Sequence, residues 1–169
     1  MNKLLLVRPT FGSFAKATTV FILSVVVVNI VLLLMNSLPK PLHQFGWNHY
    51  MPFGISIAII VFVMPAVETF IIIGSTRWAA KSVHSYWLIC CLGALPLALM
   101  HIYDGWTKPL DVVLAFIWSA HCYLQLQPET TFKQRYLFLV GIHSVSNAFF
   151  LGVTLLSAAA LQAQQHALR

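Results

Sequence analysis

The sequence predicts an all-α fold, a polytopic transmembrane bundle of about five helices, and composition and length are the first evidence for it. Of the 169 residues, 59% are hydrophobic and 8% are charged, and the mean hydropathy is +0.82. A globular domain carries about a quarter charged residues, because its surface must be wetted by water. Lipid must therefore be most of this chain's solvent. At about 20 residues per crossing, the length allows roughly five or six spans, which indicates one transmembrane domain over residues 1–169.

Five apolar segments follow one another along the chain, and polar or proline-containing connections separate them. The segments are Thr18–Leu38, Phe53–Gly74 (with a continuation to Ala80), Tyr86–Tyr103, Leu110–Leu126 and Tyr136–Leu161. The first is longer than the apolar core of a secretory signal peptide and lacks a small-residue cleavage site. We therefore interpret it as a retained first helix.

The positively charged residues predict the orientation, because cytoplasmic connections carry an excess of Lys and Arg. A cytoplasmic N-terminus places seven of these residues inside and three outside. The inner set is Lys3, Arg8, Lys16, Arg77, Lys81, Lys133 and Arg135, and the outer set is Lys40, Lys108 and Arg169. We therefore expect an N-in, C-out topology. The aromatic-rich stretch Lys40–Met51 is expected to lie at the membrane interface.

Composition also excludes several function classes. The net charge of +6 is spread over single residues between apolar runs, so we expect no nucleic-acid partner. Cys90, Cys91 and Cys122 lie inside apolar stretches without a CxxC spacing, which favours small buried side chains over disulfides or metal ligands. No cofactor and no metal is expected. Without an organelle address in the sequence, we expect a multi-pass protein of the bacterial inner membrane, in contact with the lipid bilayer.

One acidic residue stands out because of its position. Of the four acids, Asp104, Asp111 and Glu129 lie in or beside connections, whereas Glu68 lies deep in the run MPAVETFIII. A carboxylate at the centre of a membrane helix costs about 2.5–3.5 kcal/mol even on the lenient insertion scale, so such a residue is a functional candidate. Pro65, three residues earlier, removes a backbone hydrogen bond and tends to kink the helix.

Histidines in neighbouring segments lie at matching depths. Glu68 and His101 are nearly equidistant from the centre of the hairpin that joins their segments. His143 lies eight residues after Arg135, about 12 Å at 1.5 Å per residue, and Glu68 lies a similar distance before Arg77. The three side chains are therefore predicted to meet at one level of the membrane.

The last segment also carries an amide side chain, that of Asn147, near the level of His143. His143 and Asn147 are four residues apart and project from one helix face. Ser144, Ala148 and Gly152 form a small-residue stripe beside them, which favours close approach of another helix. The polar pair is therefore expected to face protein.

The order of these residues resembles the CPBP family of CAAX-processing and bacteriocin-processing (Abi-type) intramembrane proteases. That family carries EExxxR with a preceding proline and a following glycine, then FxxxH, then HxxxN or HxxxD. In this chain, PAVETFIIIG matches the first motif at Pro65, Glu68 and Gly74. LALMH matches the second at His101 with Leu97 in place of Phe, and HSVSN matches the third at His143 and Asn147. The resemblance covers residues 53–152, the expected CPBP-like core. Thr69 and Ile73 stand where the family has its second Glu and its Arg.

The resemblance implies an intramembrane endopeptidase that acts on a membrane-associated or lipidated peptide. Glu68 would be the general base, and His101 would help to position the attacking water. His143 and Asn147 would donate hydrogen bonds to the oxyanion, where one donor is worth about 10²–10³ in rate.

Three other functions remain open on the sequence. A catalytically inactive CPBP-like adaptor that binds a partner membrane protein is favoured by Thr69 and Ile73, but retention of a costly intramembrane carboxylate argues against it. A metal enzyme or carrier would use Glu68 with the intramembrane histidines, among them His121, but the chain has no HExxH or other closely spaced ligand pair. In a transporter, Glu68 would be a proton relay, although about five spans are few for internal repeats.

Overall fold

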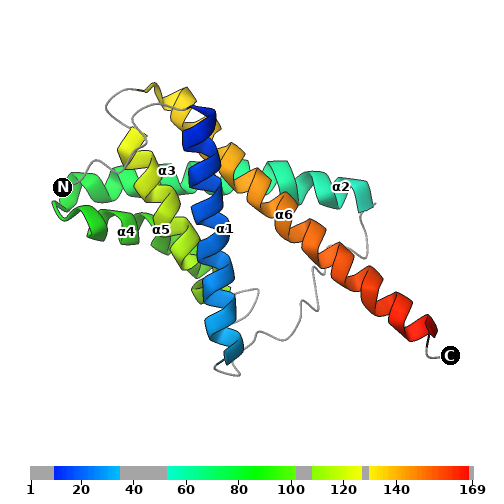
Figure 1. Ribbon diagram of the computed structural model, residues 1–169. Helices are drawn as coiled ribbons and strands as arrows, with labels where there is room; N and C mark the ends of the chain where they lie inside the picture. Colours follow the sequence, from blue (N-terminus) through cyan, green and yellow to red (C-terminus); the bar gives the residue numbers. More distant parts are fainter. Residues whose placement is uncertain (1–9, 35–52, 102–107, 127–129, 168–169) are drawn as a thin grey trace.

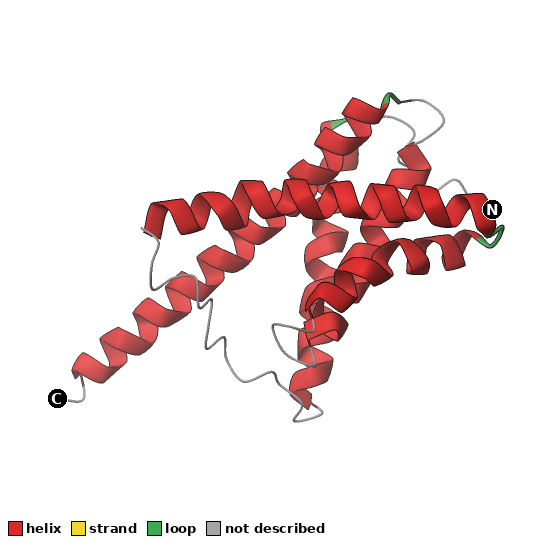
Figure 2. Cartoon of the chain, turned by 180° about the vertical axis from the view of Figure 1, so that it is seen from behind, coloured by secondary structure: helices red, strands yellow, loops and turns green. Residues whose placement is uncertain are grey.

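The computed structural model describes residues 10–34, 53–101, 108–126 and 130–167, and every regular element in these ranges is helical (Figure 1; Figure 2). The elements are α1 (Phe11–Leu34), α2 (Phe53–Ala58), the π-helical segment η2 (Ile59–Val63), α3 (Met64–Ser82), α4 (Tyr86–Met100), α5 (Lys108–Leu126) and α6 (Phe132–Ala167). Because α2, η2 and α3 follow one another directly in the chain, they form one long rod, whose α-helical hydrogen bonding is interrupted at the π-helical segment. The all-α prediction is confirmed for the described residues. The expected interfacial stretch, Lys40–Met51, lies outside them, as do Asp104 and Glu129.

Two helices begin earlier than hydropathy predicts, because polar residues cap them. At the start of α6, the Thr131 amide donates to Gln134 Oε1 at 2.9 Å, and the Gln134 amide donates to Thr131 Oγ1 at 3.3 Å. This reciprocal pair is a capping box, which satisfies amide groups that a helix start leaves without partners. Thr10 and Ser13 make a similar pair at the start of α1. The apolar segments thus mark the lipid-compatible part of each helix and not its ends.

Three of the described helices are long and apolar enough to cross a membrane. The candidate spans are Phe11–Val28, Gly54–Ser82 and Phe132–Gln164, and the apolar helices Tyr86–Met100 and Val112–Leu126 are shorter. Many large apolar side chains point away from the protein, including Phe70 at 64% exposure and Leu156 at 73%. Such extensive exposure of apolar side chains indicates a surface that contacts lipid or other apolar groups instead of water.

The helices pack across one another instead of running in parallel. The rod formed by α2, η2 and α3 runs at a steep angle to α1, whereas α5 and α6 contact α1 directly (Figure 1). One apolar cluster joins α1, α3, α5 and α6 around Phe21, Ile73 and Tyr123, and a second joins α3, α4 and α5 around Ile72, Leu97 and Phe116. The helix ends at the top and left of Figure 1 are the N-terminal ends of α1, α4 and α6 and the C-terminal ends of α3 and α5.

Close helix approach occurs at Gly93 on α4. A Cβ at this position would lie 2.2 Å from Thr76 Oγ1 of α3, and the Ser75 hydroxyl donates to the Gly93 carbonyl at 2.6 Å. By contrast, a Cβ at Gly152 would meet nothing within 4 Å, and Ala148 is exposed. The small-residue stripe expected on α6 is therefore not the site of close packing at these two positions.

Candidate active site

The polar site begins with a break in the rod that carries Glu68. Met64 donates its amide to the Ile59 carbonyl, five residues back, so the helix is π-helical just before Pro65. A π turn accommodates one extra residue and is frequent at functional sites. Pro65 is the second residue of α3, where a proline is tolerated because the first amides of a helix need no helix partner. Glu68 is the fifth residue of α3, just after its first turn, and its side chain is buried.

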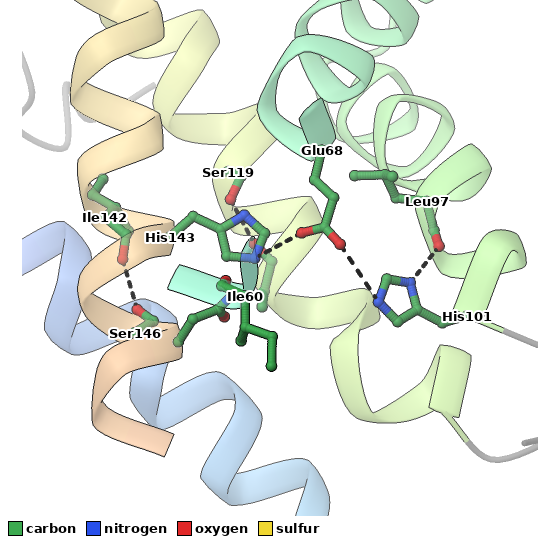
Figure 3. A network of polar contacts seen from close by, with 10 residues as sticks. Ile60, Glu68, Leu97, His101, Ser119, Ile142, His143 and Ser146 are labelled. Carbon is green, nitrogen blue, oxygen red and sulfur yellow. Dashed lines mark hydrogen bonds and ion pairs between the residues drawn. The ribbon is translucent and has the colours of Figure 1, made fainter. Parts of the chain in front are cut away.

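Glu68 contacts His143 of α6 directly. The His143 Nε2 lies 3.1 Å from Glu68 Oε2, and both side chains are at least nine-tenths buried (Figure 3). The His143 ring packs beside Phe21 of α1 and Phe116 of α5, with ring centroids 5.2 and 5.9 Å apart. At this spacing His143 Nε2 donates to an ionised Glu68 through a charge-assisted hydrogen bond. The surrounding aromatic rings fix the position of the imidazole.

His101 faces the other oxygen of the same carboxylate. Its Nε2 lies 3.8 Å from Glu68 Oε1, and its Nδ1 lies 2.8 Å from the Leu97 carbonyl (Figure 3). Because a carbonyl can only accept, Nδ1 carries the hydrogen, and Nε2 of the neutral ring is an acceptor. The 3.8 Å separation is too long for a direct hydrogen bond. With 21% of its side chain exposed, His101 is the most accessible of the three groups.

Asn147 has a different partner from the one expected. Its side-chain nitrogen Nδ2 donates to the Ile60 carbonyl of η2 at 2.9 Å. The structure therefore brings Glu68, His101 and His143 together, and it places Asn147 against the backbone of the broken rod. Both expected oxyanion donors are bonded to protein groups in this geometry, His143 to Glu68 and Asn147 to Ile60.

Tyr136 is a site neighbour that sequence reasoning missed. It lies on α6 seven residues before His143, and its hydroxyl donates to the Ala66 carbonyl of α3 at 3.1 Å. Two helical turns separate positions seven apart, so Tyr136 and His143 share a helix face. That spacing was the available signal in the sequence, but Tyr136 stands at the start of an apolar segment, where a tyrosine has no evident polar partner.

The two positions that depart from the CPBP pattern are both in the interior. Thr69 and Ile73 are each 2% exposed, and Ile73 belongs to the apolar cluster around Phe21 and Tyr123. An arginine at position 73 would thus enter an apolar core. Thr69 and Ile73 are uncharged, so they can be buried in this core without a second carboxylate or an arginine beside Glu68.

His121 lies in a separate cluster between α4 and α5. Its ring stacks between Trp87 and Trp118, and its Nδ1 lies 2.9 Å from the Tyr86 hydroxyl, which accepts from Gln125. It is not among the residues around Glu68. Within the described residues, no group of three or more His, Cys, Asp or Glu side chains is arranged to hold a metal ion.

No family model, curated protein or solved structure matches this chain. The resemblance to the CPBP family therefore depends on the motif residues and their order alone.

Proposed function

We propose that this chain is a multi-pass protein of the bacterial inner membrane with a cytoplasmic N-terminus and an external C-terminus. The three long apolar helices and the exposed apolar side chains support a membrane location. The helix ends gathered at the top and left of Figure 1 belong to segments that carry Lys16, Arg77, Lys81, Lys133 and Arg135. Basic residues on one side of a bundle favour a cytoplasmic face there. The steep crossing of α1 and α3 requires strongly tilted spans.

We further propose that the protein is an intramembrane endopeptidase of the CPBP type that cleaves a membrane-associated or lipidated peptide. One observation carries this proposal: the buried Glu68 carboxylate lies between two imidazoles from different helices, His143 at 3.1 Å and His101 at 3.8 Å. Intramembrane carboxylates are costly, and a pair of titratable partners around one is typical of acid–base chemistry.

The orientation of His101 suits activation of a water molecule. Glu68 Oε1 and His101 Nε2 both accept hydrogen bonds, so a water can donate one hydrogen to each. In the proposed reaction the water oxygen attacks the peptide carbonyl carbon, and its proton passes to Glu68. The C–N bond then breaks, and Glu68 delivers that proton to the leaving amine nitrogen. His143 orients the carboxylate through Oε2.

Stabilisation of the oxyanion by His143 and Asn147 stays a prediction. In the geometry described, each would have to release its protein partner to donate to a substrate oxygen. Donor groups at a catalytic site often reach their final alignment only when substrate is bound.

The test compares cleavage by the wild type with cleavage by Glu68→Gln and His143→Ala. Candidate substrates come from mass spectrometry of new peptide termini in membranes of cells that express the wild type, and one such peptide is then cleaved by purified protein in lipid vesicles. We expect Glu68→Gln to lower the rate by about 10²–10⁴, the usual contribution of a general base. His143→Ala should lower it comparably, since it removes the group that orients the carboxylate.

His84→Ala is the matched control, because this exposed histidine lies in the turn between α3 and α4, away from Glu68. Its rate should equal that of the wild type, and all variants should extract into detergent as folded protein. Cleavage by Glu68→Gln at the wild-type rate would refute the protease proposal.

A catalytically inactive adaptor is the second candidate, and the buried Thr69 and Ile73 favour it. Glu68→Leu separates the two functions. An adaptor should keep its partner membrane protein and gain stability from the substitution, because a buried charge is replaced by an apolar group. A protease should lose cleavage.

A further inference from the structure

The break in the rod leaves a specific carbonyl without a helix partner. In an α-helix the Ile60 carbonyl would accept from Met64, but the Met64 amide donates to Ile59. In the π register Ile60 would accept from residue 65, which is a proline and has no amide hydrogen. Neither helix register can therefore satisfy this carbonyl. Within a membrane such a group must find another donor, because lipid offers none.

Asn147 supplies that donor from α6. Its Nδ2 lies 2.9 Å from the Ile60 oxygen, on the N-terminal side of Pro65. Tyr136 makes the equivalent contact on the C-terminal side, where its hydroxyl lies 3.1 Å from the Ala66 oxygen. The two bonds thus flank Pro65, and His143 lies between their donors along α6.

We infer that Tyr136 and Asn147 are positioning residues that clamp the broken rod against α6 and so hold Glu68 at His143. A helix that lacks hydrogen bonds at a proline can bend there, and a bend at Pro65 would move Glu68 relative to α6. The two α6 bonds hold the backbone on both sides of the possible bend. The inference rests on the proposed function in treating Glu68 as the reactive group, and it assigns Asn147 a backbone contact as its main role.

The test measures how fast a hydrophobic carbodiimide modifies Glu68 in detergent-solubilised protein, with the modified peptide quantified by mass spectrometry. The readout requires no substrate and no cleavage. Asn147→Leu keeps the branching and the number of side-chain heavy atoms but removes the donor. Pro65→Ala restores an amide that can satisfy Ile60 within the helix. The four proteins are the wild type, each single variant and the double variant.

We expect Asn147→Leu to speed modification of Glu68 roughly fivefold, the population change that one ordinary hydrogen bond produces. In the Pro65→Ala background the same substitution should have little effect, because Ile60 no longer needs a side-chain donor. An equal effect in both backgrounds, or none in either, would overturn the assignment of Asn147. If Asn147→Leu does not yield folded protein, Asn147→Ala completes the same cycle.

Tyr136→Phe should also speed modification, and Tyr86→Phe is its matched control. Tyr86 is likewise a hydrogen-bonded, partly buried tyrosine, but it contacts His121 and Gln125 instead of the rod. If the carbodiimide modifies Glu68 at the same rate in both variants, Tyr136 has no positioning role. Cleavage by Glu68→Gln is a separate measurement. The positioning role of Tyr136 and Asn147 can therefore be refuted while the proposed protease function stands, and the protease function can be refuted while the positioning role stands.

Discussion

At the scale of single residues, hydrogen-bond direction decides what each polar group can do. The Leu97 carbonyl holds the Nδ1 hydrogen of His101, so the Nε2 that faces Glu68 is an acceptor. His143, at 3.1 Å from the same carboxylate, donates to it when Glu68 is ionised. The two histidines thus have different roles in the proposed reaction: His101 lies beside the proposed water, and His143 orients the Glu68 carboxylate. Second partners of this kind commonly fix the tautomer of a functional histidine.

The two substituted motif positions make a prediction at the same scale. Ile73→Arg should destabilise the protein by about 3–5 kcal/mol, because it buries a charge without a partner. Thr69→Glu/Ile73→Arg should recover part of this loss, since residues four apart on a helix can form an ion pair. Thermal unfolding in detergent of both single variants and the double variant checks this. Additive effects would show that the two side chains do not interact.

At the scale of elements, close contact between helices depends on a few small residues. The α3–α4 contact brings Thr76 and Ser75 against Gly93, so backbone and hydroxyl groups meet where no side chain can fit. Membrane helices use such positions because apolar surface alone gives little drive to associate in lipid. This contact also sets the relative positions of Glu68 on α3 and His101, which directly follows α4.

Gly93→Ala is therefore expected to destabilise the hairpin by about 1–3 kcal/mol, the usual cost of overpacking a tight contact. The new Cβ would overlap Thr76 Oγ1, at 2.2 Å. Adding Thr76→Ala should restore part of the stability, because it removes the nearest atom. Gly152→Ala is the matched control, since a Cβ there meets nothing within 4 Å. Unfolding midpoints that fall equally for Gly93→Ala and Gly152→Ala would contradict this account.

At the scale of the whole molecule, the arrangement of helix ends predicts how the protein sits in the membrane. If the basic ends face the cytoplasm, α6 must run outward and end outside. Alkaline phosphatase, which is active only outside the cytoplasm, should be active when fused after the C-terminus. The same enzyme fused at His84, in the α3–α4 turn, should be inactive. The opposite pattern would reverse the proposed topology.

The sequence by itself determined the helical class, the apolar segments and the small set of polar residues within them. Composition indicates that lipid surrounds most of the chain. The constant rise of a helix predicts the depth of a residue in the membrane from its distance to a charged helix end. Glu68, His101 and His143 were found on these grounds, and they meet in the structure. The helix starts at Phe11 and Phe132 were missed, because hydropathy is insensitive to the capping residues Thr10 and Thr131.

Only the tertiary structure decided which donor meets which acceptor. The π turn before Pro65 inserts one residue and rotates every later side chain of the rod, so helix periodicity could not predict the direction of Glu68. The same turn leaves the Ile60 carbonyl without a backbone donor in the helix, and the Asn147 side chain supplies a donor. A rise per residue gives depth along the membrane, whereas partners depend on rotation about each helix axis and on how closely neighbouring helices pack.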